Sequence, residues 1–89
     1  MARMDMAMLD KAELAAQTGA PDALYELGLR YCTGREVDLD LVTAHKWFNL
    51  AALRGNKAAL DQRLELAREM SRCQVAEAQK AARGWLATH

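Results

Sequence analysis

The sequence predicts an all-α protein, a short right-handed α-α solenoid of five helices that form about two and a half helical repeats. The first reason is an internal repeat with a period of 36 residues. Ala15, Ala16, Gly19, Ala23 and Leu24 recur as Ala51, Ala52, Gly55, Ala59 and Leu60. A fixed period of about 20–50 residues is typical of proteins in which helical units stack on their neighbours. The second reason is that no segment alternates apolar and polar residues with the period of two expected of a strand.

Two helices are predicted in the first part of the chain. The first covers about residues 5–18 and ends at Gly19. The second begins at Pro21, because a proline at the first helical position loses no hydrogen bond, and it ends near Gly34. Gly28 lies in the middle of this helix, where it lowers the helix propensity by about 1 kcal/mol relative to alanine. We therefore expect another helix to cross closely at Gly28.

A connector of residues 34–40 leads to a third helix over about residues 41–54. Asp38 or Asp40 is expected to cap this helix, since a carboxylate accepts hydrogen bonds from the free N–H groups of the first turn. Gly55 is expected to end it. The helix has a wide apolar face. Its inward residues are predicted to be Ala44, Trp47, Phe48, Ala51 and Ala52.

Two more helices are predicted in the last part of the chain. The fourth covers about residues 57–70 and is capped by Asn56. Ser71 and Gln74 form a capping box that starts the fifth helix, which runs to about Leu86. In both helices, apolar residues at helical spacing are expected to face inward. They are Ala59, Leu60, Leu64, Ala67 and Met70 in the fourth helix and Val75, Ala78, Ala82 and Trp85 in the fifth.

Apolar, aromatic and glycine residues and one aspartate stand at fixed spacing between residues 23 and 55. They are Ala23, Leu27, Gly28, Tyr31, Gly34, Val37, Asp40, Ala44, Trp47, Phe48, Ala51, Ala52 and Gly55. This pattern resembles a Sel1-like repeat, a relative of the tetratricopeptide repeats with a longer turn between its two helices. Glu36 stands where that family usually has glycine, which predicts a turn of different conformation. After residue 55 the pattern weakens, because Arg63, Leu64 and Ala67 replace the expected leucine, glycine and tyrosine.

The resemblance implies a single helical-repeat domain over residues 1–89. Residues 1–19 are then an N-terminal capping helix, and residues 20–55 are a complete Sel1-like repeat. Residues 56–89 are a diverged C-terminal repeat that covers the end of the core. The family implies adaptor or scaffold roles in assembling other proteins. We therefore expect a non-catalytic protein-interaction module whose partner is another protein or a peptide.

The charges indicate which partners to expect. The 12 basic and 12 acidic residues cancel, so net charge favours neither a nucleic acid nor a membrane. No run of about 18 apolar residues is present, as a membrane span would need, and a cytoplasmic location is expected.

Residues 1–45 hold eight acidic and four basic side chains, whereas residues 46–89 hold four acidic and eight basic ones. This polarity leaves open an alternative function: a structural, self-associating protein that forms a homo-oligomer.

The residue types that perform catalysis or bind metals form no recognisable motif. Cys32 and Cys73 match neither a metal-ligand spacing nor a CxxC motif, and we expect both to be buried free thiols. His89 is the last residue. His45 lies beside the apolar face of the third helix and is expected to be solvated or singly hydrogen-bonded. We therefore expect no catalytic residue, no metal and no cofactor, and we do not expect an enzyme.

The resemblance places the partner-binding surface on the first helix of each unit, which lines the concave side in repeats of this kind. The predicted binding residues are Asp22, Tyr25, Glu26, Leu29 and Arg30 and, 36 positions later, Asp61, Gln62 and Glu65, with Ala58 and Leu66 also facing solvent. Tyr25 and Leu29 lie one helical turn apart, and a tyrosine close to an arginine is typical of interface hot spots. The alternative for these two residues is that they pack against the first helix.

Overall fold

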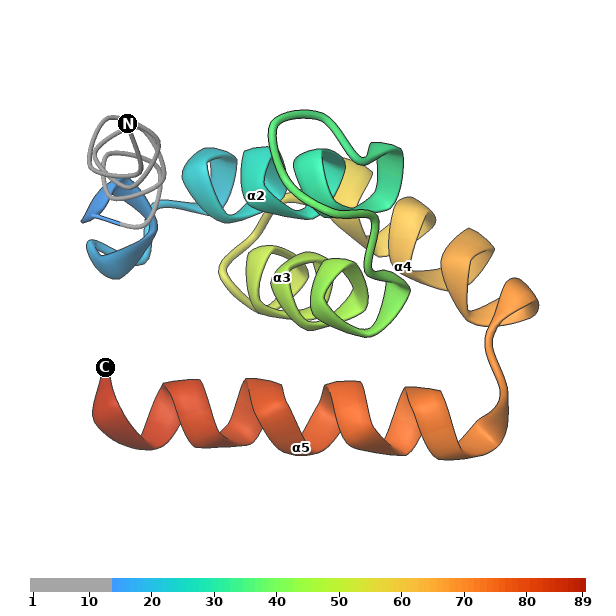
Figure 1. Ribbon diagram of the computed structural model, residues 1–89. Coiled ribbons are helices and arrows are strands. Elements are labelled where there is room, and N and C mark those ends of the chain that lie inside the picture. The colour runs from blue at the N-terminus through green and yellow to red at the C-terminus, as the bar shows by residue number, and fades with distance from the viewer. Residues whose placement is uncertain (1–13) are drawn as a thin grey trace.

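The computed structural model describes residues 14–89, and within that part of the chain it contains helices and their connectors but no strand (Figure 1). Residues 14–17 form a helical turn, and four helices follow. They are α2 (Pro21–Thr33), α3 (Leu41–Leu53), α4 (Lys57–Glu69) and α5 (Arg72–Thr88). The predicted all-α class is confirmed, and the boundaries of these four helices agree closely with the predicted ones. Most of the helix predicted over residues 5–18 lies outside the described residues.

The three helices that follow α2 begin at the side chains predicted to cap them. The carboxylate of Asp40 accepts a hydrogen bond from the backbone N–H of Thr43 at 3.1 Å, and Asn56 caps α4 in the same way. Ser71 and Gln74 form the predicted capping box at the start of α5, each side chain accepting from the other residue's backbone N–H. Each cap satisfies donors that the first helical turn leaves without a partner, so the helix starts are determined locally.

The connector between α2 and α3 contains two residues in the left-handed region. Gly34 has a φ of 72° and Glu36 has a φ of 68°. This region is sterically easy for glycine and uncommon for other residues. The Glu36 carboxylate forms an ion pair with Arg30 of α2 at 2.9 Å, which fastens the connector to that helix. Glu36 therefore keeps a glycine-like backbone conformation at a position where the Sel1-like pattern has glycine, contrary to the expectation of a different conformation there.

Helix α3 is the centre of the fold. Helices α2, α4 and α5 each pack against it, whereas α4 and α5 make few contacts with each other (Figure 1). Four residues of α3 are completely shielded from solvent: Ala44, Phe48, Leu50 and Ala51. The predicted inward residues of α3 are confirmed, with Ala52 half-buried at the edge of the core. The burial of Leu50 was not predicted.

Helices α2 and α3 are in close contact at Gly28. A Cβ atom added to Gly28 would lie 2.5 Å from Cδ1 of Phe48, far inside van der Waals contact. Phe48 is itself fully buried, so its ring has no free space to move into. The predicted close crossing at Gly28 is therefore confirmed, and α3 is the helix that makes it.

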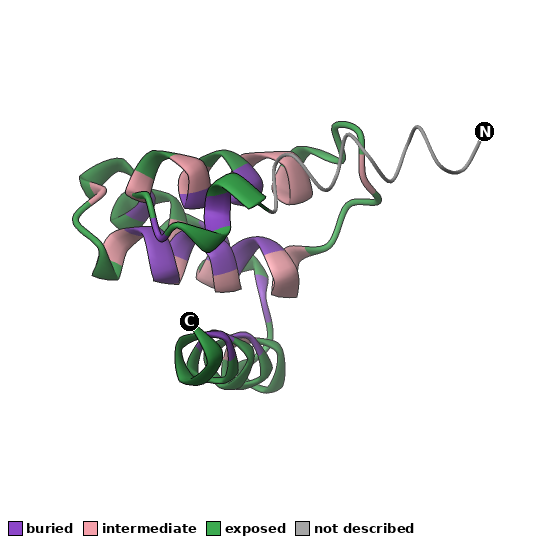
Figure 2. Cartoon of the chain, turned by 90° about the vertical axis from the view of Figure 1, so that its left-hand side faces the viewer, coloured by how far each residue is buried: buried purple, intermediate pink, exposed green. Residues whose placement is uncertain are grey.

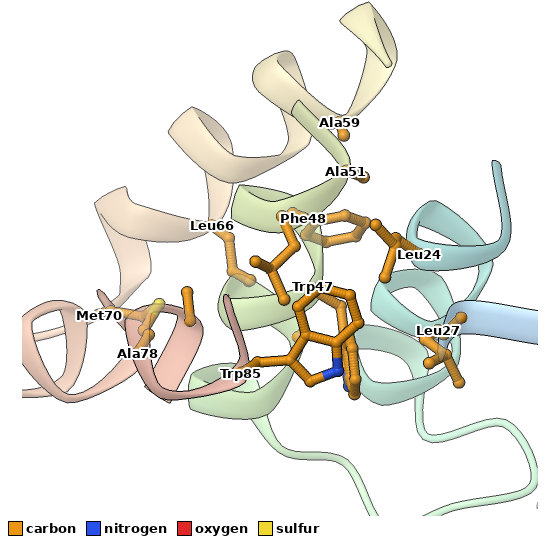
Figure 3. Close-up of a cluster of buried hydrophobic side chains, with 14 residues drawn as sticks. Leu24, Leu27, Trp47, Phe48, Ala51, Ala59, Leu66, Met70, Ala78 and Trp85 are labelled. Carbon is orange, nitrogen blue, oxygen red and sulfur yellow. The ribbon is translucent and has the colours of Figure 1, made fainter. Parts of the chain in front are cut away.

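Aromatic rings attach α5 to α3. Trp85 meets Trp47 edge to face, with ring centroids 6.1 Å apart and ring planes at 79° (Figure 3). Aromatic pairs in this geometry are stabilising beyond the area they bury. Ala82 and Ala78 lie one and two turns before Trp85, and all three are buried. Helix α5 is buried only along the side that carries these residues (Figure 2).

Helix α4 buries only part of the face predicted. Leu60 and Leu64, expected to face inward, are 40% and 55% exposed, whereas Leu66, expected to face solvent, is buried. The spacing of apolar residues placed Leu60 and Leu64 inward, and the 36-residue shift from α2 placed Leu66 in solvent. The shift fails because α4 has Arg63 and Leu64 where α2 has Leu27 and Gly28, so α4 does not repeat the close packing of α2. The predicted burial of Ala59 and Met70 is confirmed, and Leu66 is the third buried residue of α4 and its C-terminal cap.

We predict that Gly28→Ala destabilises the protein by about 1–3 kcal/mol, although alanine is the better helix former, because its methyl group overlaps the Phe48 ring. Gly84→Ala in α5 is the matched control, since a Cβ there meets nothing within 4 Å. That variant is expected to stabilise the protein by about 0.5–1 kcal/mol. Urea denaturation followed by circular dichroism measures both free energies of unfolding. Equal effects of the two substitutions would contradict the close α2–α3 crossing.

Candidate functional site

The five binding residues predicted in α2 fall into two groups. Asp22 and Glu26 are exposed, and the other three are half-buried. The ring of Tyr25 contacts that of Phe48, with centroids 5.7 Å apart, and Leu29 packs against the buried core. Each of these two side chains therefore packs on one side against the core around α3 and is exposed to solvent on the other.

The charged residues of α2 differ in the ion pairs and hydrogen bonds that they form. Arg30 is held by its ion pair with the connector, and its Nε is buried without a hydrogen-bond partner. Glu26 lies 3.5 Å from Arg35, with both side chains exposed, and exposed pairs of this kind contribute little to stability. Asp22 accepts a hydrogen bond from the Asn56 side chain at 3.2 Å, which links the start of α2 to the start of α4. Glu26 is thus the acidic residue of α2 most available to a partner.

The three binding residues predicted in α4 are all exposed: Asp61, Gln62 and Glu65. Within the described chain, Asp61 and Gln62 make no hydrogen bond or ion pair, and Glu65 forms only an exposed pair with Arg68 at 3.5 Å. Helices α2 and α4 both rest on α3 and contact each other little along their lengths. The predicted residues therefore occupy two separate helices that share one support.

A cleft that sequence reasoning did not predict lies between α4 and α5, with α3 at its base. We call it the α4/α5 cleft, and it has a volume of about 270 Å³. Its lining residues are His45 of α3, Arg63, Leu64 and Ala67 of α4, and Val75 and Gln79 of α5. A volume just below the range of small-molecule pockets leaves room for one or two side chains. The cleft exists because α4 and α5 pack on α3 more than on each other.

His45 is the buried polar residue at the base of this cleft. The prediction that it is solvated or singly hydrogen-bonded is wrong, because its side chain is only 3% exposed and its Nδ1 has no hydrogen-bond partner among the described residues. Burial, and to a smaller extent the positive charge of Arg63, lower the pKa of His45 below its ordinary value of 6.5. His45 is therefore neutral at neutral pH. Its position next to the apolar stripe of α3 was visible in the sequence, but its burial by α4 and α5 was not.

A wider groove runs beside the connector. Its volume is about 940 Å³, and it extends from Tyr31 past the connector to Val42 of α3 and Gln74 of α5. Leu39 is 61% exposed there. Asp38 is exposed as well, and it forms no hydrogen bond or ion pair with any described residue. The groove therefore carries an apolar side chain beside a free carboxylate.

The two cysteines are free thiols, as predicted, but only one of them is shielded. Cys32 is half-buried, and burial raises the pKa of its thiol above the ordinary value of 9.0. Cys73 is exposed at the start of α5, so the expectation that both are buried is wrong for Cys73. It lies in the first turn of a helix whose buried side begins with Ala78, which leaves its own side chain in solvent. The protonated form of Cys32 is favoured at neutral pH.

No described helix is long and apolar enough to cross a membrane. Among residues 14–89 there is also no group of three or more histidine, cysteine, aspartate or glutamate side chains placed to hold a metal ion. In comparisons with known proteins, no protein-family model, no curated protein and no solved structure matches the chain. The Sel1-like resemblance therefore depends on the residues of the repeat pattern alone.

We predict that His45 makes the stability of the protein depend on pH. Its pKa in the folded state is lower than the value of about 6.5 expected in the unfolded chain, so the unfolded chain takes up the proton first as pH falls. Stability is therefore complete above about pH 6.5 and decreases as pH falls through and below that value. Urea denaturation at about pH 7.5, 6.5 and 5.5 measures the loss.

The variant His45→Gln should lose this part of the pH dependence, whereas the control His89→Gln should keep it. Residue 89 is exposed at the end of α5 and lies outside the cleft. If wild type and His45→Gln weaken equally over this range, the buried state of His45 is contradicted.

Proposed function

We propose that this chain is a non-catalytic protein-interaction module, an adaptor or scaffold, whose helices form a short right-handed Sel1-like solenoid of about two and a half repeats. The 36-residue period and the successive packing of α2, α3 and α4 support the repeat architecture. The proposed partner is another protein or a peptide. It binds to the exposed sides of α2 and α4.

The observation that carries this proposal is a set of exposed polar side chains on two helices that both pack on α3. Glu26 of α2 and Asp61, Gln62 and Glu65 of α4 are exposed, and both helices pack on α3. Side chains on packed helices are already positioned, so a partner does not have to order the backbone that carries them. Three of the four are carboxylates, which favours a partner segment that carries lysine or arginine.

The titratable groups most affected by the fold support a role without catalysis. The raised pKa of Cys32 disfavours the thiolate that a nucleophile needs. The lowered pKa of His45 keeps its ring neutral, and the ring is almost fully buried. A general base must reach the proton it removes, and a shielded ring with a neighbouring cation is poorly suited to that task.

Self-association is a second candidate function, and the charge distribution favours it. Residues 21–40 carry five acidic and two basic side chains, whereas residues 41–89 carry four acidic and eight basic ones. Opposite charges on two parts of one surface can steer identical molecules toward each other. In this case the homo-oligomer is the functional unit, and no separate partner is required.

The partner-binding proposal is tested by capturing binding proteins from the cells that produce this chain. We compare the wild-type protein with a double variant, Glu26→Gln with Asp61→Asn, which removes one charge from each helix and keeps side-chain size. Hydrogen bonds to charged groups contribute about 1.5–3 kcal/mol each, so the double variant should bind a partner at least about tenfold more weakly. Affinity is then measured with the purified partner.

The control is a second double variant, Asp38→Asn with Glu77→Gln, which removes the same charge from exposed positions outside α2 and α4. It should bind as the wild type does. All of these residues are exposed, so circular dichroism should show unchanged helix content. Equal binding by both double variants would contradict the α2/α4 surface, and the failure of wild type to capture any protein would favour self-association.

A further inference from the structure

The α4/α5 cleft has a chemistry that the partner-binding surface does not use. Leu64, Ala67 and Val75 give it apolar walls, and His45, Arg63 and Gln79 give it polar groups. No acidic side chain is among its lining residues in the described chain. The cleft therefore combines apolar surface with an excess of positive charge.

Arg63 is the source of that charge. Its Nη1 donates a hydrogen bond to Asn49 at 2.6 Å, which fixes the guanidinium beside the cleft. No carboxylate of the described residues forms an ion pair with it. A half-buried cation without an acidic partner is stabilised by an incoming carboxylate, so the best occupant is an apolar side chain with a carboxylate beside it.

The connector of the same protein presents such a pair. Leu39 is 61% exposed, and Asp38 immediately precedes it. The other two carboxylates of the connector are already used, because Glu36 pairs with Arg30 and Asp40 caps α3. Asp38 is thus the carboxylate of the connector that remains available to a second molecule.

The connector and the cleft are neighbours on the molecule. The groove beside the connector reaches Val42 of α3 and Gln74 of α5. The cleft begins at His45, one turn after Val42, and at Val75, the residue after Gln74. When a projecting group and its receptor lie on adjacent parts of one surface, two copies related by a two-fold axis can make the same contact twice. The arrangement therefore suits a closed dimer.

We infer that two copies of this chain associate reciprocally: Leu39 of each copy enters the α4/α5 cleft of the other, and Asp38 meets Arg63. This dimer rests on the second candidate function, self-association, and gives it a defined contact. It uses none of the four residues that carry the partner-binding proposal. Two insertions of one side chain each make a small interface, of the size class of weak and transient contacts. The dimer is therefore expected at high protein concentration and low salt.

Sedimentation equilibrium over a range of protein concentrations tests the dimer, at about 0.05 M and about 0.5 M salt. The wild type should approach the mass of a dimer at the highest concentration in low salt, and the added salt should weaken the association. Asp38→Arg and Arg63→Glu should each weaken association at least tenfold, because each places two like charges at the contact. The double variant Asp38→Arg with Arg63→Glu should recover it, because the charges are then opposite again.

Glu77→Arg is the control for charge alone, since Glu77 is exposed on α5 and does not line the cleft. It should dimerise as the wild type does. If circular dichroism shows that Arg63→Glu impairs folding, Asp38→Arg and Leu39→Ser decide the matter, because both positions are exposed.

A monomeric wild type at every concentration in low salt would overturn the inference. So would a dimer that survives Asp38→Arg and Leu39→Ser. If the protein dimerises in this way but captures no partner, only the partner-binding proposal is contradicted. If partner binding is lost only in the Glu26/Asp61 double variant and the wild type stays monomeric, only the dimer is contradicted.

Discussion

The burial of α3 is the constraint on which the other helices depend. Its buried residues extend well beyond one stripe: Ala44, Phe48 and Ala51 share one side of the helix, and His45 and Leu50 lie on opposite flanks of it. A helix with so wide a buried surface must be covered from several directions. Helices α2, α4 and α5 cover it from three, so the positions of all three follow from the side chains of α3.

The three helices that cover α3 pack on it in different ways. Gly28 lets α2 approach α3 as closely as the Phe48 ring permits, and Trp85 attaches α5 edge to face against Trp47. Helix α4 has no glycine at its contact, and its exposed side carries polar residues and two exposed leucines. Because α4 and α5 both pack on α3 and contact each other little, a cleft remains between them. One arrangement thus produces both the fixed helices of the proposed partner surface and the receptor of the proposed dimer.

Much of the fold could be predicted because its determinants are local. Pro21 starts a helix, and Asp40, Asn56 and Ser71 cap helices, through bonds that span only a few residues. The burial of Leu66 and the exposure of Leu60 and Leu64 in α4 could not be predicted, because the face that a helix buries depends on its neighbour. The burial of His45 and the cleft depend on how α4 and α5 meet α3, which no single segment encodes. The exposure of Asp61, Gln62 and Glu65 agrees with the prediction, since charged and amide side chains favour solvent.

The central claim is that α3 holds the molecule together, and native-state amide hydrogen exchange tests it directly. Amides that open only on global unfolding exchange most slowly, at the free energy of unfolding of the whole domain. If α3 is the shared support, its amides from Ala44 to Ala51 should be the slowest of residues 14–89, and those of α2, α4 and α5 should exchange no more slowly. A slower set of amides in α2 or α5, with α3 exchanging through local opening, would contradict this account.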